Sequence, residues 1–378
     1  MESSTIEIVG LHSSRSEHDP LTMNALVCTA SALLVAVSIS VAAPAGNYPS
    51  LPSKVLSNYT PSKVDSHDSE TMANRANAFL SSLDKKLRAQ AALPLNSPEK
   101  PKWTNVPPRG PQGGVRLGDL NEKQLETACD LLAAVLSPQG YGKARNIPLA
   151  DDRLLRNGQR RPGFGAEDYW LAIFGEPSPD TPWALQFDGH HIAINLAFHG
   201  ERMSMSPTFI GTQPREFQLG GKKIVPMEKE APTGLALFQS LTGSQKKKAT
   251  IRPKRANLVA AAGRDGFVPD PLGLSCENLK NEQRAILMNV LKSYVGDLPG
   301  AHAEYRLKEL RTEIDQMRFA WWGPGEKGGD FSYRIQGPSV IIEYAGQDLG
   351  GDPHNHLHSM YRDPTNEYGA RLGKKAKD

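Results

Sequence analysis

The sequence predicts an α+β fold in which helices pack on an antiparallel β-sheet. Its 34 glycines and 29 prolines among 378 residues indicate many turns and long loops, which argues against a helical bundle. Hydrophobic residues make up 39% and charged residues 22%, which is sufficient for a large core and excludes a disordered chain. The spacing of apolar residues switches along the chain between the helical period and strand alternation. The lack of repeated long apolar runs excludes a multi-span membrane protein.

An apolar run without a charged residue occupies residues 24–43. A run of about twenty such residues is long enough to span a bilayer. The small residues Val41-Ala42-Ala43, followed by Pro44-Ala45-Gly46, resemble a signal-peptidase site. We therefore predict that residues 1–43 are either a cleaved export signal or an anchor helix. The protein is then exported (periplasmic or secreted) or membrane-anchored, and it contacts the membrane only through residues 24–43.

The rest of the chain divides into three stretches. Residues 44–69 are rich in Ser, Pro and Asn, which predicts a poorly ordered linker. Residues 70–372 mix helical and strand patterns without an internal repeat, which predicts a single α+β domain. Residues 373–378 are basic and terminal, which predicts a frayed tail.

Helical spacing of apolar residues predicts five helices, over residues 70–92, 125–136, 233–241, 279–294 and 307–317. The second of these ends at Ser137-Pro138, because proline cannot continue a helix from the preceding residue. Residues 94–118 contain several prolines and glycines and no period, which predicts a loop.

Two segments show strand alternation, and each predicts a hairpin region of the antiparallel sheet. Between Trp183 and Gly211, apolar residues alternate with small or polar ones, with a turn at His199-Gly200-Glu201. Between Phe331 and Arg362, a turn at Gly337-Pro338 and a polar loop separate three further strands. We expect one shared sheet, because that arrangement would bring the histidines of both regions together.

Charge and cysteine content bound the possible partners. A formal net charge of +3 does not require an acidic partner. The basic run over residues 246–255 has no interleaved aromatic residue, which is typical of a solvated helix end, so we predict no nucleic-acid partner. Cys129 and Cys276 lie in the part that remains after cleavage, and the sequence leaves open whether they form a disulfide or are buried free thiols.

Histidine clusters are the main chemical signal. His354, His356 and His358 occur at alternate positions, and in an extended strand such residues share one face. Neutral imidazoles at this spacing are typical of a site for a divalent transition metal such as zinc, copper or iron. We predict His356 and His358 as metal ligands. The alternative is that these histidines hydrogen-bond backbone groups or carboxylates on a polar face of the sheet.

Glu343, on the preceding predicted strand, is the expected third ligand, because two histidines and one carboxylate form a common metal-binding set. His190 and His191 lie on the other hairpin region and are predicted catalytic residues, one of them serving as a further ligand or a general base. Only one of the two is expected on the site's face, because adjacent strand residues point in opposite directions.

Arg362 is an even number of residues from His356 and His358, so it would lie on the same face of the strand. It is a further catalytic candidate, because a guanidinium beside the histidines would bind a carboxylate or phosphate. A structural salt bridge to Asp188 or Glu343 is the alternative. Trp321-Trp322 would line a sugar or aromatic pocket, or pack in the core. The glycines of the segment FAWWGPGEKGG match a dinucleotide-binding pattern only by letter, because the strand-loop-helix context is absent.

A family resemblance rests on the blocks GYGKARNI, DYWLAIFGEPS, FDGHHIAIN, PTFIGTQP, FAWWGP, YRIQGP and HNHLHSMYRDPTNEYG, in this order. Over residues 72–372 the chain resembles the uncharacterised family known as domain of unknown function 3500. That resemblance implies one coherent unit but no established reaction. The tail GARLGKKAKD departs from the family, which tends to carry another His-Tyr pair there. The resemblance draws attention to Asp188, Gly189, His190, His191, Asn195, Glu343, His356, His358, Arg362 and Asp363.

These observations predict an exported, metal-dependent enzyme, either a hydrolase or an oxidoreductase, with a histidine-rich site on a β-sheet. The alternative is a non-catalytic cell-envelope protein that binds a carbohydrate or peptide through the tryptophan pair and Arg362. The expected partner is a small-molecule or carbohydrate ligand in either case.

Overall fold

The computed structural model describes residues 49–110, 112–155 and 161–372. These residues fall within one compact unit. The apolar run at 24–43 and the basic tail at 373–378 lie outside the described residues. Within the described ranges, the helices are too short or too polar to cross a membrane.

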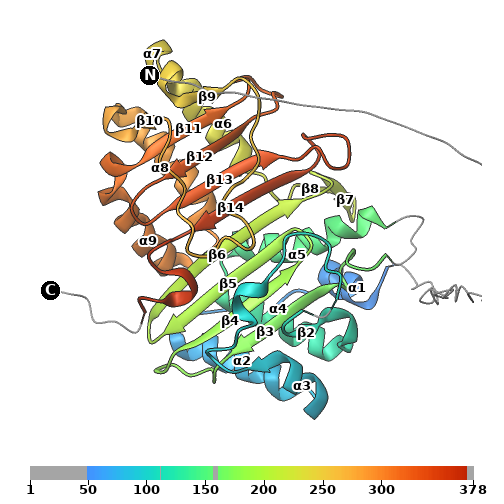
Figure 1. The fold of residues 1–378 in the computed structure, drawn as a ribbon. Coiled ribbons are helices and arrows are strands. Elements are labelled where there is room, and N and C mark those ends of the chain that lie inside the picture. Colours follow the sequence, from blue (N-terminus) through green and yellow to red (C-terminus); the bar gives the residue numbers. More distant parts are fainter. Residues whose placement is uncertain (1–48, 111, 156–160, 373–378) are drawn as a thin grey trace, which may run out of the picture. The chain divides into compact units, whose positions relative to one another are not determined.

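A single twelve-stranded sheet runs through the unit (Figure 1). Its strands pair antiparallel, except that β1 on β3 and β9 on β11 are parallel. The main path runs, in order, through β1 (Ala92–Leu93), β3 (Tyr169–Phe174), β4 (Trp183–Gly189), β5 (Ile192–His199), β6 (Arg202–Thr212), β14 (Leu357–Arg362), β13 (Ile341–Gly346), β12 (Ser332–Gln336), β11 (Arg318–Trp322) and β10 (Leu274–Ser275). Off this path, β2 (Val115–Arg116) pairs with β3 and β9 (Thr250–Arg252) with β11, while β7 (Phe217–Leu219) and β8 (Lys222–Ile224) form a separate hairpin.

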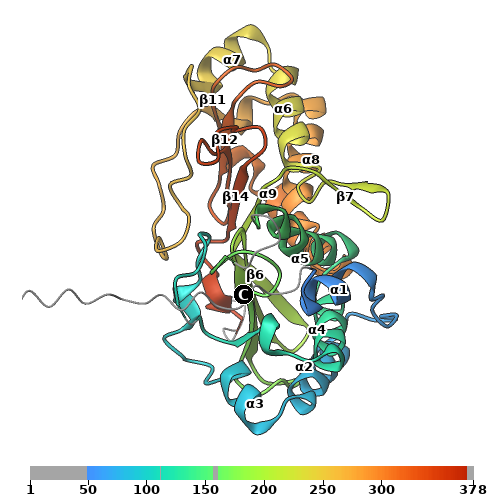
Figure 2. The same ribbon diagram turned by 90° about the vertical axis from the view of Figure 1, so that its right-hand side faces the viewer.

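The larger helices cover one face of this sheet (Figure 2). The described helices are α1 (Leu51–Asn58), α2 (Ser69–Ser82), α3 (Lys85–Ala91), α4 (Glu122–Val135), α5 (Pro138–Asp151), α6 (Glu230–Ser240), α7 (Gly243–Ala249), α8 (Asn281–Val295) and α9 (Gly300–Thr312). Their starts follow the usual capping chemistry. Asn121 and Gln124 form a capping box at α4, and the Ser137 hydroxyl accepts from the Gly140 N–H at α5, which has proline in its first turn.

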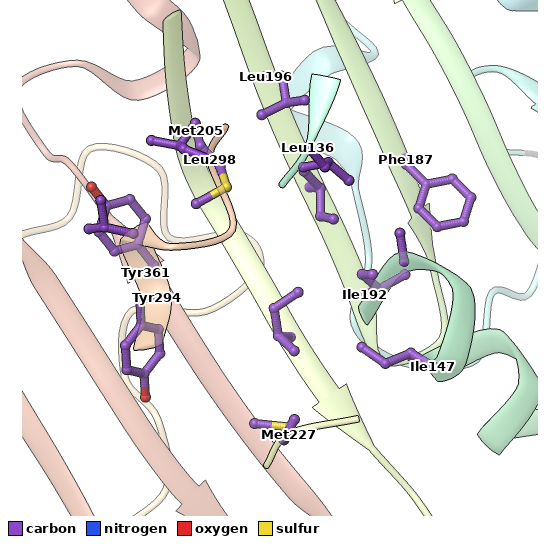
Figure 3. Packing of buried hydrophobic residues seen from close by; sticks show 14 of the residues in the cluster. Leu136, Ile147, Phe187, Ile192, Leu196, Met205, Met227, Tyr294, Leu298 and Tyr361 are labelled. Carbon is purple, nitrogen blue, oxygen red and sulfur yellow. The ribbon is translucent and has the colours of Figure 1, made fainter. Parts of the chain in front are cut away.

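The main hydrophobic core lies between these helices and the sheet (Figure 3). Phe187 and Ile192 project from β4 and β5 toward Leu136 and Ile147 of the helical layer. All four side chains are fully buried. Because burial of one such side chain contributes about 1.5–3 kcal/mol, this layer supplies most of the apolar stabilisation of the unit.

The opposite face of the same strands is polar and is covered by loops rather than helices (Figure 2). Gln186 donates to the carbonyl of Lys100 at 2.8 Å and to the Asn195 side chain at 2.6 Å. A small apolar cluster under these loops consists of Trp103, Ala193, Phe209 and Met360. The two segments that close this face include residues 97–105 and 256–270, both without long helices.

The single-sheet prediction is confirmed. Strands β6 and β14, from the two hairpin regions, are hydrogen-bonded neighbours, with His358 opposite Gly211. The turn predicted at 199–201 also occurs, between β5 and β6. The first region, however, contains three strands rather than one hairpin, because a second turn falls at His190-His191.

Several element boundaries differ from the predictions. The helix expected over 70–92 is interrupted at Leu83-Asp84, because Asp84 caps a new helix, α3. Ser137-Pro138 begins α5 as well as ending α4, since a serine N-cap followed by proline is a strong helix start. Strand β3 was not predicted, because its run YWLAIF is buried on both faces and shows no alternation.

The segment 44–69 is not a simple linker. Helix α1 lies within it, and Val55 and Leu56 are buried in the main core. Ser53 donates to the Asp152 carboxylate at 2.7 Å, which ties this helix to the end of α5. Serine and proline also suit a helix N-terminus, which is how they act here.

Candidate functional site

Three histidine side chains converge where the β4–β5 turn meets the start of β14. The Nε2 atoms of His191 and His356 are 2.8 Å apart, and those of His356 and His358 are 3.0 Å apart. One ligand atom from each of the three lies within 4.8 Å of the others, so the group could hold a metal ion. His191 and His356 are buried, while His358 is partly exposed.

The backbone places His191 in this group. His191 has a φ of 71°, the left-handed conformation that non-glycine residues rarely adopt. Its carbonyl accepts from the N–H of Gly211 at 2.6 Å, which joins the turn to β6. A Cβ atom on Gly211 would lie 3.0 Å from Cδ2 of His358 and 3.2 Å from Cδ2 of His191. Glycine at this position therefore lets the two rings approach each other.

The two histidines of β14 and its preceding turn are oriented by their neighbours. Nδ1 of His356 donates to the carbonyl of Leu349 at 2.5 Å, which leaves its Nε2 unprotonated in the neutral ring. The ring of His358 packs edge-on against Phe209, with centroids 5.0 Å apart. These contacts aim both Nε2 atoms at the same point.

Burial keeps the three rings neutral. Desolvation lowers the pKa of His191 and of His358 well below the usual histidine value, and the neighbouring histidines lower both further. Desolvation also lowers the pKa of His356. Unprotonated imidazole is the form that binds a metal ion.

The spacing of the nitrogens suits a cation better than hydrogen bonds. His356 Nε2 has one lone pair, yet two imidazole nitrogens lie within 3.0 Å of it. A single N–H can satisfy that lone pair, whereas one cation can satisfy all three nitrogens. Tetrahedral ligands at 2.0–2.1 Å from zinc are separated by about 3.3 Å, so a small expansion of the cluster would accommodate the ion.

A second group, formed by Asp151, His190 and His191, shares His191 with the first. Asp151 Oδ1 is 2.7 Å from Nδ1 of His190, and its Oδ2 accepts from the Gly165 N–H at 2.8 Å. The rings of His190 and His191 stack with centroids 3.7 Å apart and an interplanar angle of 26°. Lone pairs of stacked rings run side by side and do not converge, so this group is a hydrogen-bonded support for His191.

This stacking corrects one prediction. His190 and His191 were expected to point to opposite faces of a strand. They lie instead in a turn, where the positive φ of His191 brings the two rings onto the same side. Asp151, the partner of His190, was not predicted. It ends helix α5, and no local pattern links it to a histidine 39 residues away.

Glu343 belongs to neither of the metal-competent groups found among the described residues. Its carboxylate accepts from Nε of Arg334 at 2.9 Å and from the N–H groups of Val259 and Ala260 at 3.0 and 2.8 Å. In the sheet it lies opposite Met360. Glu343 thus holds the loop over the polar face of the sheet, and His191 occupies the third place in the cluster.

Arg362 and the tryptophan pair are also held by the protein itself. Nε of Arg362 donates to Glu367 at 2.5 Å, and its Nη1 donates to the carbonyl of Phe267 at 2.9 Å. This salt bridge is structural, although its partner is neither of the two carboxylates expected. Trp321 stacks in the core on Phe238, and Trp322 is only 7% exposed. These side chains do not form an open binding surface.

Asp188 is buried in the polar face and has an unusual environment. Desolvation raises its pKa to about 8, although a hydrogen bond from the backbone of Thr104 opposes this. Its Oδ1 atom has no hydrogen-bond partner among the described residues. Burial therefore favours the protonated carboxyl of Asp188, which no local sequence pattern indicated.

Cys129 and Cys276 are both buried free thiols. Burial raises the pKa of Cys129 to about 11 and that of Cys276 to about 12, so neither is a reactive thiolate. Of the two alternatives left open by the sequence, the structure therefore has buried free thiols and not a disulfide.

The chain matches one known protein family. A model described as "Protein of unknown function (DUF3500)" matches residues 65–370. The chain belongs to the DUF3500 family. Neither the curated proteins nor the solved structures contain a significant match. For this DUF3500 protein, evidence about function comes from the histidine cluster itself.

Proposed function

We propose that this DUF3500 protein is a metal-dependent enzyme whose ion is bound by His191, His356 and His358. The observation that carries the proposal is the convergence of three neutral imidazole nitrogens, two pairs of them 2.8 and 3.0 Å apart. Burial and backbone hydrogen bonds hold these rings in place without an ion, which lowers the cost of organising the site.

The number of ligands favours catalysis over a structural role. Structural zinc sites are closed by four protein ligands, whereas catalytic sites use three and leave a position open for substrate. Among the described residues the cluster offers three ligand atoms, and Glu343 is occupied by Arg334 and two backbone N–H groups. Partly exposed His358 marks the side from which a substrate would approach.

All-imidazole coordination selects the borderline transition metals, and zinc, copper and iron are the proposed ions. A bound ion of this kind would act as a Lewis acid toward a substrate oxygen. Asp151 and His190 support the site from behind, since Asp151 fixes the His190 ring, which stacks on His191. Such supporting contacts orient metal ligands and strengthen binding.

The alternative of a non-catalytic carbohydrate- or peptide-binding protein has less support. It relied on Trp321, Trp322 and Arg362, all of which are buried and engaged with other residues. The histidine cluster, by contrast, has nitrogens whose mutual arrangement a cation satisfies best.

Metal analysis of the purified full chain tests the proposal. We expect about one equivalent of zinc, copper or iron, and its loss in the variant with His356→Ala and His358→Ala. His354→Ala is the matched control, because it removes an imidazole from the same segment but from outside the cluster. A folded wild-type protein that binds none of the three ions after metal reconstitution would overturn the proposal.

The metal found then selects the reaction to assay. Zinc directs the search to hydrolysis of ester, amide and phosphoester substrates, and copper or iron directs it to oxidation. Activity should disappear with a chelator and return with the ion. A stoichiometric metal without chelator-sensitive turnover on either panel would assign the site to binding instead of catalysis.

We also propose that the protein is exported or membrane-anchored through residues 24–43, on the strength of the sequence pattern there. The N-terminus of the protein recovered from cells distinguishes the two. A start near Pro44 would indicate cleavage, and an intact N-terminus in the membrane fraction would indicate an anchor. Full-length protein in the cytoplasm would contradict both.

A further inference from the structure

A second candidate site lies on the helix-covered side of the sheet, near α6. A cavity of about 240 Å³ is bounded there by α6, the loop between β11 and β12, and the ends of β13 and β14. Its apolar walls include Ala231, Leu235, Phe331 and Leu357. None of the three clustered histidines lines it, so it is separate from the proposed metal site.

The polar groups at this cavity are mainly cationic. Arg215 and Lys327 both line it, and neither side chain has an ion-pair or hydrogen-bond partner within the described ranges. The one carboxylate in its lining, Asp330, accepts from Nε of Arg255 at 2.7 Å, and Arg255 also pairs with Asp348. His354 is the third basic side chain of the lining. The cavity thus combines an apolar interior with unpaired positive charge.

The glycine-rich segment between β11 and β12 explains how Lys327 reaches the cavity. Gly328, next to Lys327, has a φ of 80°, which a side chain would rarely permit. A Cβ at Gly325 would lie 2.1 Å from a ring carbon of Phe238, so the backbone there packs closely on α6. The segment FAWWGPGEKGG, which is not a dinucleotide-binding motif, thus places Lys327 at the cavity beside α6.

We propose that this cavity binds a small organic anion with an apolar body, such as an aromatic carboxylate. Arg215 would bind the anionic group, since a guanidinium recognises a carboxylate through two parallel N–H donors. Lys327 would add a second charge, while Leu235, Phe331 and Leu357 would enclose the apolar part. The small volume restricts the ligand to about one ring with a short substituent.

This inference does not rest on the metal site. Leu357 lines the cavity, whereas His356 and His358 on either side of it belong to the cluster. Adjacent strand residues face opposite sides of a sheet, so one short segment contributes to both sites from different faces. Anion binding can therefore be measured in metal-free protein.

Calorimetric titration of the full chain with benzoate tests this inference. Benzoate should bind saturably, while benzamide, which has the ring without the charge, and acetate, which lacks the ring, should bind at least tenfold more weakly. Arg215→Gln should weaken benzoate binding about tenfold, because it removes a charge-assisted contact. Lys222→Gln is the control, since it removes an exposed lysine outside the cavity.

Ala236→Phe is a second variant that fills the cavity from the exposed side of α6 and should abolish binding without loss of the fold. Benzoate binding that survives both Arg215→Gln and Ala236→Phe would overturn the inference, as would equal affinity for benzamide. The double His356→Ala, His358→Ala variant should keep its benzoate affinity. A histidine variant that loses metal but binds benzoate, or an Arg215→Gln variant that binds metal but not benzoate, would show that the two sites are independent.

Discussion

The two faces of the central sheet differ although they are made by the same strands. On the helix-covered face, Phe187 and Ile192 pack among apolar side chains from α4 and α5. On the loop-covered face, neighbouring positions carry Gln186, Asp188 and Asn195, which hydrogen-bond to one another or to the backbone of loops and of β6. One face stabilises the fold mainly by apolar burial, and the other combines small apolar clusters with buried polar contacts that hold loops in place.

This difference between the faces also concerns the position of the proposed metal site. Apolar packing is insensitive to exact polar geometry, whereas each buried polar group needs its partner. His358 lies on the loop-covered face next to Phe209, and its cluster forms where the β4–β5 turn meets the start of β14. The face that contributes less apolar stabilisation therefore carries the proposed metal site.

The largest expected effect comes from the helix-covered face. Phe187→Ala should lower the free energy of unfolding by about 3–5 kcal/mol, because it leaves a cavity beneath α4 and α5. Chemical denaturation monitored by circular dichroism measures this. Metal content per folded molecule should not change, and a selective loss of metal in this variant would contradict the division between the faces.

Glu343→Gln tests the loop-covered face. It should cost about 3 kcal/mol, because Arg334 is left buried without its charge partner. Metal content should match that of the wild type, since Glu343 lies outside the histidine cluster. If the variant retained its stability and lost its metal, Glu343 would be a ligand as the sequence predicted.

Asp188 predicts a pH dependence of stability. Burial raises its pKa from the ordinary aspartate value to about 8 in the folded protein, so the folded state holds the proton more tightly. The contribution of Asp188 to stability is therefore full below about pH 4 and falls by at most about 1.4 kcal/mol per pH unit up to pH 8. Asp188→Asn should remove this slope in denaturation curves between pH 5 and 8. The exposed Asp180→Asn should leave it unaltered.

Gly211→Ala should have the smallest effect on stability, about 1–2 kcal/mol from overpacking. Its methyl group would lie 2.9 Å from the Leu357 carbonyl oxygen and 3.0 and 3.2 Å from the rings of His358 and His191. This crowding should lower metal affinity about tenfold. Competition with a coloured chelator measures the affinity. Gly220→Ala, at an open turn position, is the matched glycine control for affinity. Equal affinities in the two variants would show that Gly211 does not shape the site.

Much of the fold could be predicted from local patterns. Ile192, Ile194 and Leu196 alternate with smaller residues, and this period identifies a half-apolar strand wherever it occurs. The pattern failed at β3 and at His190-His191, because a doubly buried strand has no alternation and a turn can contain non-glycine residues. Helix α5 was not predicted, because the Ser137-Pro138 pair was interpreted only as the end of the preceding helix, whereas it also begins α5.

The sequence by itself determined that His356 and His358 form a closely spaced pair, since they are two residues apart and share one segment. Only the tertiary structure decided their partners. His191 lies 165 residues from His356, and the register of β6 against β14 brings them within 2.8 Å. Glu343 is much nearer in sequence, yet Arg334 and the loop backbone bind its carboxylate. Local spacing sets which residues share a face, but strand pairing and competition for hydrogen bonds set which of them meet.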